Sequence, residues 1–207
     1  MNENFKDTGR STREDAILIM AFQEGDKAMF DELVLKHQHK VFNLCYRLSG
    51  DYQEANDAAQ ETFMKVYESL KRFRHESAFS TWLYRIAVNI CKNKFKSLAY
   101  RQRKKTVSLD NPGLSEDDDS ALEIRDDAHS PAKELEKKER IKAIEEAIRM
   151  LPPEQKTVVT LRDIEGFSYE EIVQITGTAL GTVKSRLSRA RLDLRKRLRS
   201  VMRDELR

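Results

Sequence analysis

A basic segment near the C-terminal end of the chain carries the clearest chemical signal. Between Lys184 and Arg203 there are nine Lys or Arg residues and a single acid, Asp193. Ammonium and guanidinium groups neutralise phosphates and pair with base edges, so a run of them on one helix is an electrostatic footprint for nucleic acid. Charge alone is equally consistent with a solvated helix face that binds nothing. The preceding residues help to distinguish a nucleic-acid-binding helix from such a face.

Those preceding residues predict a helix-turn-helix. Ser168 with Glu171 three residues later predicts a capping box that opens a short helix. Thr176-Gly177-Thr178 predicts a turn, and a long helix is expected to start at Ala179 or Leu180. The N-terminal free face of such a helix enters the major groove, which here means Gly181, Thr182, Lys184, Ser185, Arg186, Ser188 and Arg189. The alternative is a helical hairpin with no DNA role.

A second candidate DNA-contacting stretch lies in the first half of the chain. Basic and aromatic residues alternate from Lys71 to Trp82, where a loop is expected to run into a helix capped by Ser80 or Thr81. Aromatic rings stack on bases, amides read base edges and lysines neutralise phosphates. The side chains available for these roles are Phe79, Trp82, Arg85, Asn89, Lys92 and Lys96. Phe79 and Trp82 can equally be core residues.

A third candidate surface lies on the helix before that stretch. Asp51 and Glu54 form a capping pair that predicts the helix start, and apolar residues from Ala55 to Leu70 form its buried face. The opposite face presents acid, amide and thioether groups at positions i, i+3, i+4 and i+7, namely Asp57, Gln60, Glu61 and Met64. Such a face suits docking of a basic helical partner, although ordinary solvated surface gives the same spacing.

Composition favours helices throughout. The chain has 207 residues, of which 39% are hydrophobic and 35% charged, with only 7 Gly and 4 Pro. Few turn formers argue against all-β folds and for helices joined by short turns, so we expect an all-α protein. Further helices are expected over residues 30–48, 133–150 and 155–164. His37, beside the buried stripe of the first of these, is expected to be a structural histidine.

Charge divides the chain into two small helical domains. Residues 110–127 hold eight acids against Arg125 alone, between segments with helical patterns. Low hydrophobicity and like charge disfavour ordering, so we expect a domain at 1–100, a flexible acidic linker at 101–133 and a second domain at 134–207. The linker is either a solvated tether or an acidic strand that mimics nucleic acid in a basic channel.

Several classes of protein are excluded on sequence. We find no apolar run long enough to span a membrane and no signal-peptide pattern in Met1–Asp15. Cys45 and Cys91 fall in apolar helical patterns, so buried free thiols and a reducing, cytoplasmic location are expected. We see no paired acid–base residues, phosphate-binding loop or metal-ligand cluster. We therefore expect a non-enzyme without catalytic residues, metal, cofactor or small-molecule substrate.

Three stretches together resemble the extracytoplasmic-function (ECF) group of bacterial sigma factors, in particular its RpoE-like members. Residues 57–63 resemble the family pattern D-x-x-Q-E-x-F, and residues 79–89 resemble F-x-T-W-L-Y-R-I-A-x-N. The third stretch comprises Leu151-Pro152, residues 166–172, and residues 181–187, which resemble the G-T-V-[KR]-S-R opening of a recognition helix. Their order along the chain is that of the family.

The resemblance implies roles for each surface. A region-2 helical bundle at 1–100 would bind the clamp helices of the polymerase β′ subunit through Asp57, Gln60, Glu61 and Met64. Its promoter-opening segment would trap a flipped base of the −10 element, with Phe73 and Arg74 in the preceding loop and Asn89 beside the pocket. A region-4 helix-turn-helix at 134–207 would read the −35 element.

The same resemblance implies partners. These are core RNA polymerase, through β′ and the β subunit, promoter DNA, and an anti-sigma factor, with the linker following the basic RNA-exit channel. A stand-alone helix-turn-helix regulator, which binds duplex DNA without polymerase, is the alternative. An enzyme is a distant third possibility.

Overall fold

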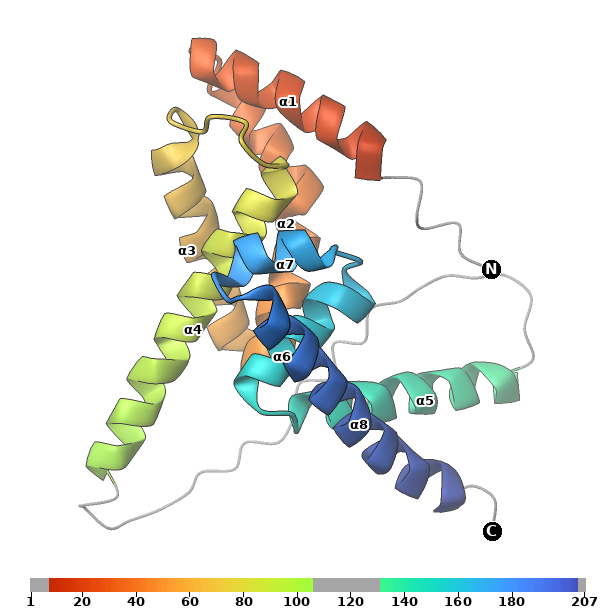
Figure 1. Ribbon diagram of the computed structural model, residues 1–207. Helices are drawn as coiled ribbons and strands as arrows, with labels where there is room; N and C mark the ends of the chain where they lie inside the picture. The colour runs from red at the N-terminus through yellow and green to blue at the C-terminus, as the bar shows by residue number, and fades with distance from the viewer. Residues whose placement is uncertain (1–7, 106–130, 205–207) are drawn as a thin grey trace.

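The computed structural model describes residues 8–105 and 131–204, and every element in those ranges is helical, as expected for an all-α protein (Figure 1). The N-terminal domain consists of α1 (Thr8–Glu24), α2 (Ala28–Ser49), α3 (Tyr52–Leu70) and α4 (Phe79–Lys105). The C-terminal domain consists of α5 (Pro131–Arg149), α6 (Pro153–Val159), the π-helical turn η1 (Thr160–Ile164), α7 (Tyr169–Thr176) and α8 (Leu180–Asp204).

Short-range sequence signals set several helix ends. The Asp51 side chain caps α3 by accepting a hydrogen bond from the Glu54 backbone N–H at 2.8 Å. Ser168 and Glu171 form the predicted reciprocal capping box at the start of α7. Gly177 ends α7 in the left-handed conformation with φ 65°, which glycine adopts without the strain that a Cβ atom brings.

Helix α1 is an element that the sequence patterns above do not predict. Its buried face consists of Asp15, Ile19 and Phe22, and α1 packs on α2. The Phe22 ring also contacts the rings of Phe30 and Tyr67. Exposed Ile17 and Met20 interrupt the expected alternation between a buried apolar stripe and a polar face. The buried face is recognisable only once α2 lies beside it.

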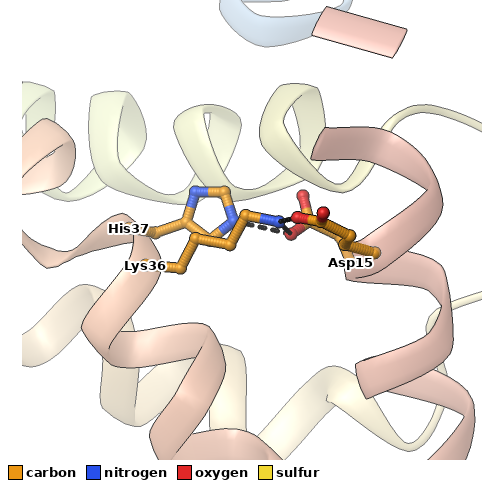
Figure 2. A network of polar contacts seen from close by, with 4 residues as sticks. Asp15, Lys36 and His37 are labelled. Atoms are coloured by element: carbon orange, nitrogen blue, oxygen red, sulfur yellow. Dashed lines mark hydrogen bonds and ion pairs between the residues drawn. The ribbon is translucent and has the colours of Figure 1, made fainter. Parts of the chain in front are cut away.

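A buried polar network fastens α1 to α2 (Figure 2). The Asp15 carboxylate is 2% exposed, and its Oδ1 lies 3.1 Å from His37 Nε2 and 2.9 Å from Lys36 Nζ. Burial by itself would raise the pKa of Asp15, but the hydrogen bonds from His37 and Lys36 outweigh it and hold that pKa below its usual value. His37 is therefore structural, as expected.

Asp15→Asn is expected to lower the free energy of unfolding by about 1–3 kcal/mol at pH 7, because it removes a charge-assisted contact from a buried site. The folded-state pKa of Asp15 lies below its unfolded value, so its contribution is complete above about pH 4 and is lost as the pH falls through the folded pKa. Urea unfolding at several pH values measures both effects. Exposed Glu32→Gln serves as the control, and an Asp15→Asn variant as stable as wild type at pH 7 would contradict the assignment.

The core of the N-terminal domain lies between α2, α3 and α4. Leu33 and Leu44 of α2 are buried with Val66 of α3 and Leu83 of α4. Cys45 and Cys91 are buried free thiols, as predicted. The hydrogen bond with Cys91, together with burial, raises the pKa of the Cys45 thiol, so this group stays protonated at neutral pH.

The two domains touch each other along their length. Helix α7 packs on α4, and α5 and α6 pack on α2 (Figure 1). Both ends of the predicted 101–133 linker are helical, because α4 continues to Lys105 and α5 begins at Pro131. Residues 106–130, with the acidic block at 110–127, lie outside the described residues. Within the described ranges, every helix is too short or too polar to cross a bilayer.

Candidate nucleic-acid interface

The helix-turn-helix presents one face of α8 to solvent. Val183, Leu187 and Ala190 are buried and hold the helix against α6 and α7. On the opposite side of α8, the residues of the first turns are short or charged and face solvent. One of them, Ser185, donates a hydrogen bond from Oγ to the Thr182 carbonyl at 3.0 Å. The exposed predicted DNA contacts are Gly181, Lys184, Ser185, Ser188 and Arg189, while Thr182 is half-buried.

Lys184 and Arg186, two of the cations predicted to contact DNA from this helix, differ in placement. Lys184 is exposed, and its Nζ lies 5.7 Å from the ring centroid of Tyr169, which supports the lysine without neutralising it. The Arg186 side chain is only 23% exposed and forms an ion pair with Glu154 at the start of α6. Arg186 thus ties α8 to α6, whereas Lys184 projects from the free face.

The first half of α4 carries a second exposed polar line. Arg85, Asn89 and Lys92 are all exposed, and their spacing of four and three residues places them along one side of the helix. Arg74 in the preceding loop is also exposed and lies 3.9 Å from Glu76. Lys96 belongs to α4, but its side chain lies outside the described part of the chain.

The aromatic residues of this segment are mostly buried. Phe79 is 3% exposed and meets the His37 ring edge-on, with centroids 5.3 Å apart. Phe73 is 8% exposed and lies 4.9 Å from the half-buried Trp82 ring. Of the two interpretations that the sequence left open for Phe79, the structure supports the core residue. Stacking of a base on Phe73 or Phe79 requires the 71–78 loop to move, while both rings here position Trp82.

The 71–78 loop is anchored and strained. Gln23 of α1 donates from Nε2 to the carbonyl oxygens of Leu70 and Phe73, each at 3.0 Å. His75 has φ 56°, the single positive φ of a non-glycine residue in the described ranges. Strain of this kind persists where surrounding contacts over-determine a backbone, which is common at binding loops. Gln23 was missed by the sequence analysis, because its partners are backbone groups about 50 residues away.

The predicted docking face on α3 is intact. Asp57 and Gln60 are exposed, and Met64 is 65% exposed, although methionine is normally a core residue. Glu61 is less exposed and its carboxylate lies 3.9 Å from Lys65 Nζ. The ordered helix therefore presents an acidic and apolar strip, which fits a partner that is both basic and apolar.

A polar contact between the domains was also missed. The buried Tyr84 hydroxyl donates to Glu165 Oε2 at 2.7 Å, and Arg47 Nη1 lies 3.5 Å from the other oxygen of that carboxylate. Burial, reinforced by the Glu165 charge, raises the pKa of the Tyr84 phenol. A tyrosine on the buried side of a helix indicates that its hydroxyl needs a hydrogen-bond acceptor. The neighbouring residues in the sequence do not show which residue supplies that acceptor.

Comparison with known proteins places these surfaces in a family. Residues 33–104 match the family described as Sigma-70 region 2, and residues 141–194 match Sigma-70 region 4. The chain is 40% identical over 191 residues to the RNA polymerase sigma-H factor of Pseudomonas aeruginosa, which covers 92% of this chain and 97% of the relative. It is 37% identical to the ECF RNA polymerase sigma-E factor of Haemophilus influenzae, with 91% and 97% covered. This chain belongs to the ECF sigma factors.

The sigma factor also resembles a solved relative over most of its length. The sigma factor RpoE of Bartonella quintana, solved in complex with the anti-sigma factor NepR, superposes with a TM-score of 0.61 at 26% identity. The match covers 82% of this sigma factor and 96% of that chain. Sigma factors are transcription initiation factors rather than enzymes. Within the described ranges, no three His, Cys, Asp or Glu side chains are grouped so as to hold a metal ion.

Proposed function

We propose that this sigma factor binds core RNA polymerase, directs it to promoters through −35 and −10 elements, and promotes opening of the DNA. The observation that carries the proposal is that three surfaces predicted from separate stretches of sequence are all exposed on one folded chain. They are the α3 face, the α4 line and the N-terminal face of α8. A protein with these three surfaces can hold polymerase and two DNA elements.

Reading of the −35 element is assigned to α8. Helix α8 enters the major groove by its N-terminal turns, where Lys184 is free to pair with guanine O6 and N7. Ser185, Ser188 and Arg189 contact bases or phosphates beside it. Gly181, with no atom near the place where a Cβ would be, allows close approach of the backbone to DNA.

Opening is assigned to α4 and its preceding loop. A base of the −10 element leaves the duplex and enters the space beside Trp82 and Asn89, while Arg85 and Lys92 hold the adjoining phosphates. Unstacking costs a few kcal/mol, which stacking and hydrogen bonds to the extruded base offset. Catalysis belongs to the polymerase, and the sigma factor lowers the barrier to melting by binding the open strand preferentially.

Two protein partners complete the proposal. Core polymerase docks on α3 through the clamp helices of β′, and its β subunit contacts region 4. An anti-sigma factor holds this sigma factor inactive, as the partner of the Bartonella quintana relative suggests. Affinity purification of the tagged protein from unstressed cells tests the second partner, and a native complex without an inhibitor would count against it.

Run-off transcription on a fragment library of the source genome tests the function. Promoter-specific transcripts that require both core polymerase and this protein are the expected result, and aligned start sites would give both elements. Tight duplex binding by the protein alone, without such transcripts, would replace the proposal with a stand-alone regulator.

Asn89→Ala is expected to leave formation of the closed promoter complex within about twofold of wild type and to slow opening by about tenfold, the value of one good hydrogen bond. Filter binding measures the first step and permanganate reactivity of unpaired thymines measures the second. A template with a pre-melted −10 region is the control, because it removes the unstacking cost and should shrink the defect. Equal opening by both proteins on several promoters would remove Asn89 from the site.

A further inference from the structure

The C-terminal end of α1 is joined to the 71–78 loop through Gln23, which lies in the last turn of that helix. Gln23 Nε2 lies 3.0 Å from the Leu70 carbonyl oxygen and 3.0 Å from the Phe73 carbonyl oxygen. A side-chain amide carries two N–H donors, so one glutamine can serve both acceptors. Gln23 therefore connects α1, the end of α3 and the loop that leads to α4 (Figure 1).

The loop has few contacts of its own that would fix its backbone. Residues 74–77 form no backbone–backbone hydrogen bond within the described part of the chain. The ion pair between Arg74 and Glu76 is exposed, and ion pairs of this kind contribute little to stability. His75 has φ 56°, a conformation that costs free energy in a residue with a Cβ atom. Contacts from outside the loop must therefore keep it in this conformation.

The residue that Gln23 holds forms one wall of the proposed base site. The Phe73 ring is 8% exposed, and its centroid lies 4.9 Å from that of the half-buried Trp82 ring, with the planes at 47°. The carbonyl and the ring of Phe73 belong to one residue, so a hydrogen bond to the carbonyl also limits where the ring can lie. Gln23 thus acts on Trp82 through one intermediate residue.

The other ring beside Trp82 is held by different contacts. The Phe79 centroid lies 6.0 Å from that of Trp82, and the Phe79 ring packs edge-on against the buried His37. Phe79 is also the first residue of α4, so its backbone belongs to a helix. Phe73 has no helix to fix it. Loss of the Gln23 contacts should therefore release Phe73 and leave Phe79 in place.

From these contacts, and resting on the proposed function, we infer that Gln23 is a positioning residue for capture of the −10 base. Gln23 holds Phe73, and Phe73 supports Trp82 in the orientation that meets the extruded base. A ring that is already in place removes an ordering cost from base binding, so the effect falls on promoter opening rather than on binding of duplex DNA. Helix α1 thereby contributes to opening without itself contacting the base.

Fluorescence of the protein alone tests the positioning step, because Trp82 is the one tryptophan of the chain. Gln23→Met keeps the length and the helix propensity of the side chain but removes both donors. It should increase the quenching of Trp82 by acrylamide, since Phe73 no longer stays against the indole ring. Gln23→Lys restores a donor on an unbranched side chain and should return the quenching toward the wild-type value.

A double-mutant cycle distinguishes action through Phe73 from a general loss of stability. In a Phe73→Leu background, Gln23→Met should add little further quenching, because the ring through which it acts is gone. Leu48→Ala is the control: it empties buried volume at the opposite end of α3 from the loop, so it should lower stability and leave Trp82 quenching unchanged. Additive effects of Gln23→Met and Phe73→Leu, or equal quenching of wild type and Gln23→Met, would overturn the inference.

Promoter opening by the holoenzyme tests the consequence. Gln23→Met should slow opening by about tenfold, the effect of one lost hydrogen bond, and leave closed-complex formation within about twofold of wild type. Permanganate reactivity of unpaired thymines and filter binding measure the two steps. Equal opening by wild type and Gln23→Met overturns the positioning role and leaves the proposed function standing. A wild-type protein that opens no promoter with core polymerase refutes the proposed function itself, whatever the fluorescence shows.

Discussion

Asp57→Lys is expected to weaken binding to core polymerase by about a hundredfold, because it sets a cation against a basic helical partner and like-charge contacts cost several kcal/mol. Asp57 is exposed and accepts a hydrogen bond from the Gln53 amide at 3.4 Å, so the fold of α3 should be unaffected by its replacement. Competition for fluorescently labelled core polymerase measures the affinity, and run-off transcription measures the consequence.

The matched control for this variant is Glu32→Lys. It makes the same charge reversal at an exposed site of the same domain, where α2 borders α1. It should bind polymerase within about threefold of wild type, since a surface charge distant from an interface is worth well under 1 kcal/mol. Equal losses in both variants would show that net charge, rather than the α3 face, governs docking.

Lys184→Ala is expected to weaken holoenzyme binding to a cognate −35 element by about 1–3 kcal/mol and to relax the base preference at one position, because a paired base contact carries both effects. The measurement is holoenzyme affinity on a set of promoters with single substitutions in the −35 element, at constant salt. The exposed position of Lys184 over the Tyr169 ring predicts that the helix itself remains folded.

Arg186→Ala is the comparison, because it removes a cation two residues away on the same helix. Arg186 is paired with Glu154 and largely covered, so its loss should lower the melting temperature and weaken binding to all −35 variants alike. If Arg186→Ala relaxed the base preference and Lys184→Ala left it unchanged, Arg186 would be the base-contacting residue and Lys184 would not.

Local patterns were sufficient for much of the architecture. Asp51, Ser168 and Gly177 act on backbone groups within a few residues of themselves, so the starts of α3 and α7 and the turn before α8 follow from sequence. Helical periodicity helped to predict the α3 face and the α8 face, and most of their residues are exposed, whereas Thr182 and Arg186 of α8 and Glu61 of α3 are only partly exposed. Periodicity works here because each helix packs one side against a single core.

Where a helix is covered on two sides, helical periodicity no longer predicts which of its residues are buried. Helix α4 packs on α2 and α3 with one side and on α7 with another, so its buried positions include Thr81, Tyr84 and Val88. Sequence reasoning left Phe79 and Trp82 open between core and DNA contact. The packing of His37 and Phe73 against them decides for Phe79 and leaves Trp82 half-exposed.

The helical class of this protein, the order of its two domains and the polar faces of its helices could all be predicted, because they depend on residues three or four positions apart. Which of those polar residues already have a partner within the protein became clear from the folded chain alone. Arg186 meets Glu154, and Tyr84 meets Glu165, across separations of 32 and 81 residues. Chain folding brings such groups together through packing of whole helices, which no local spacing encodes.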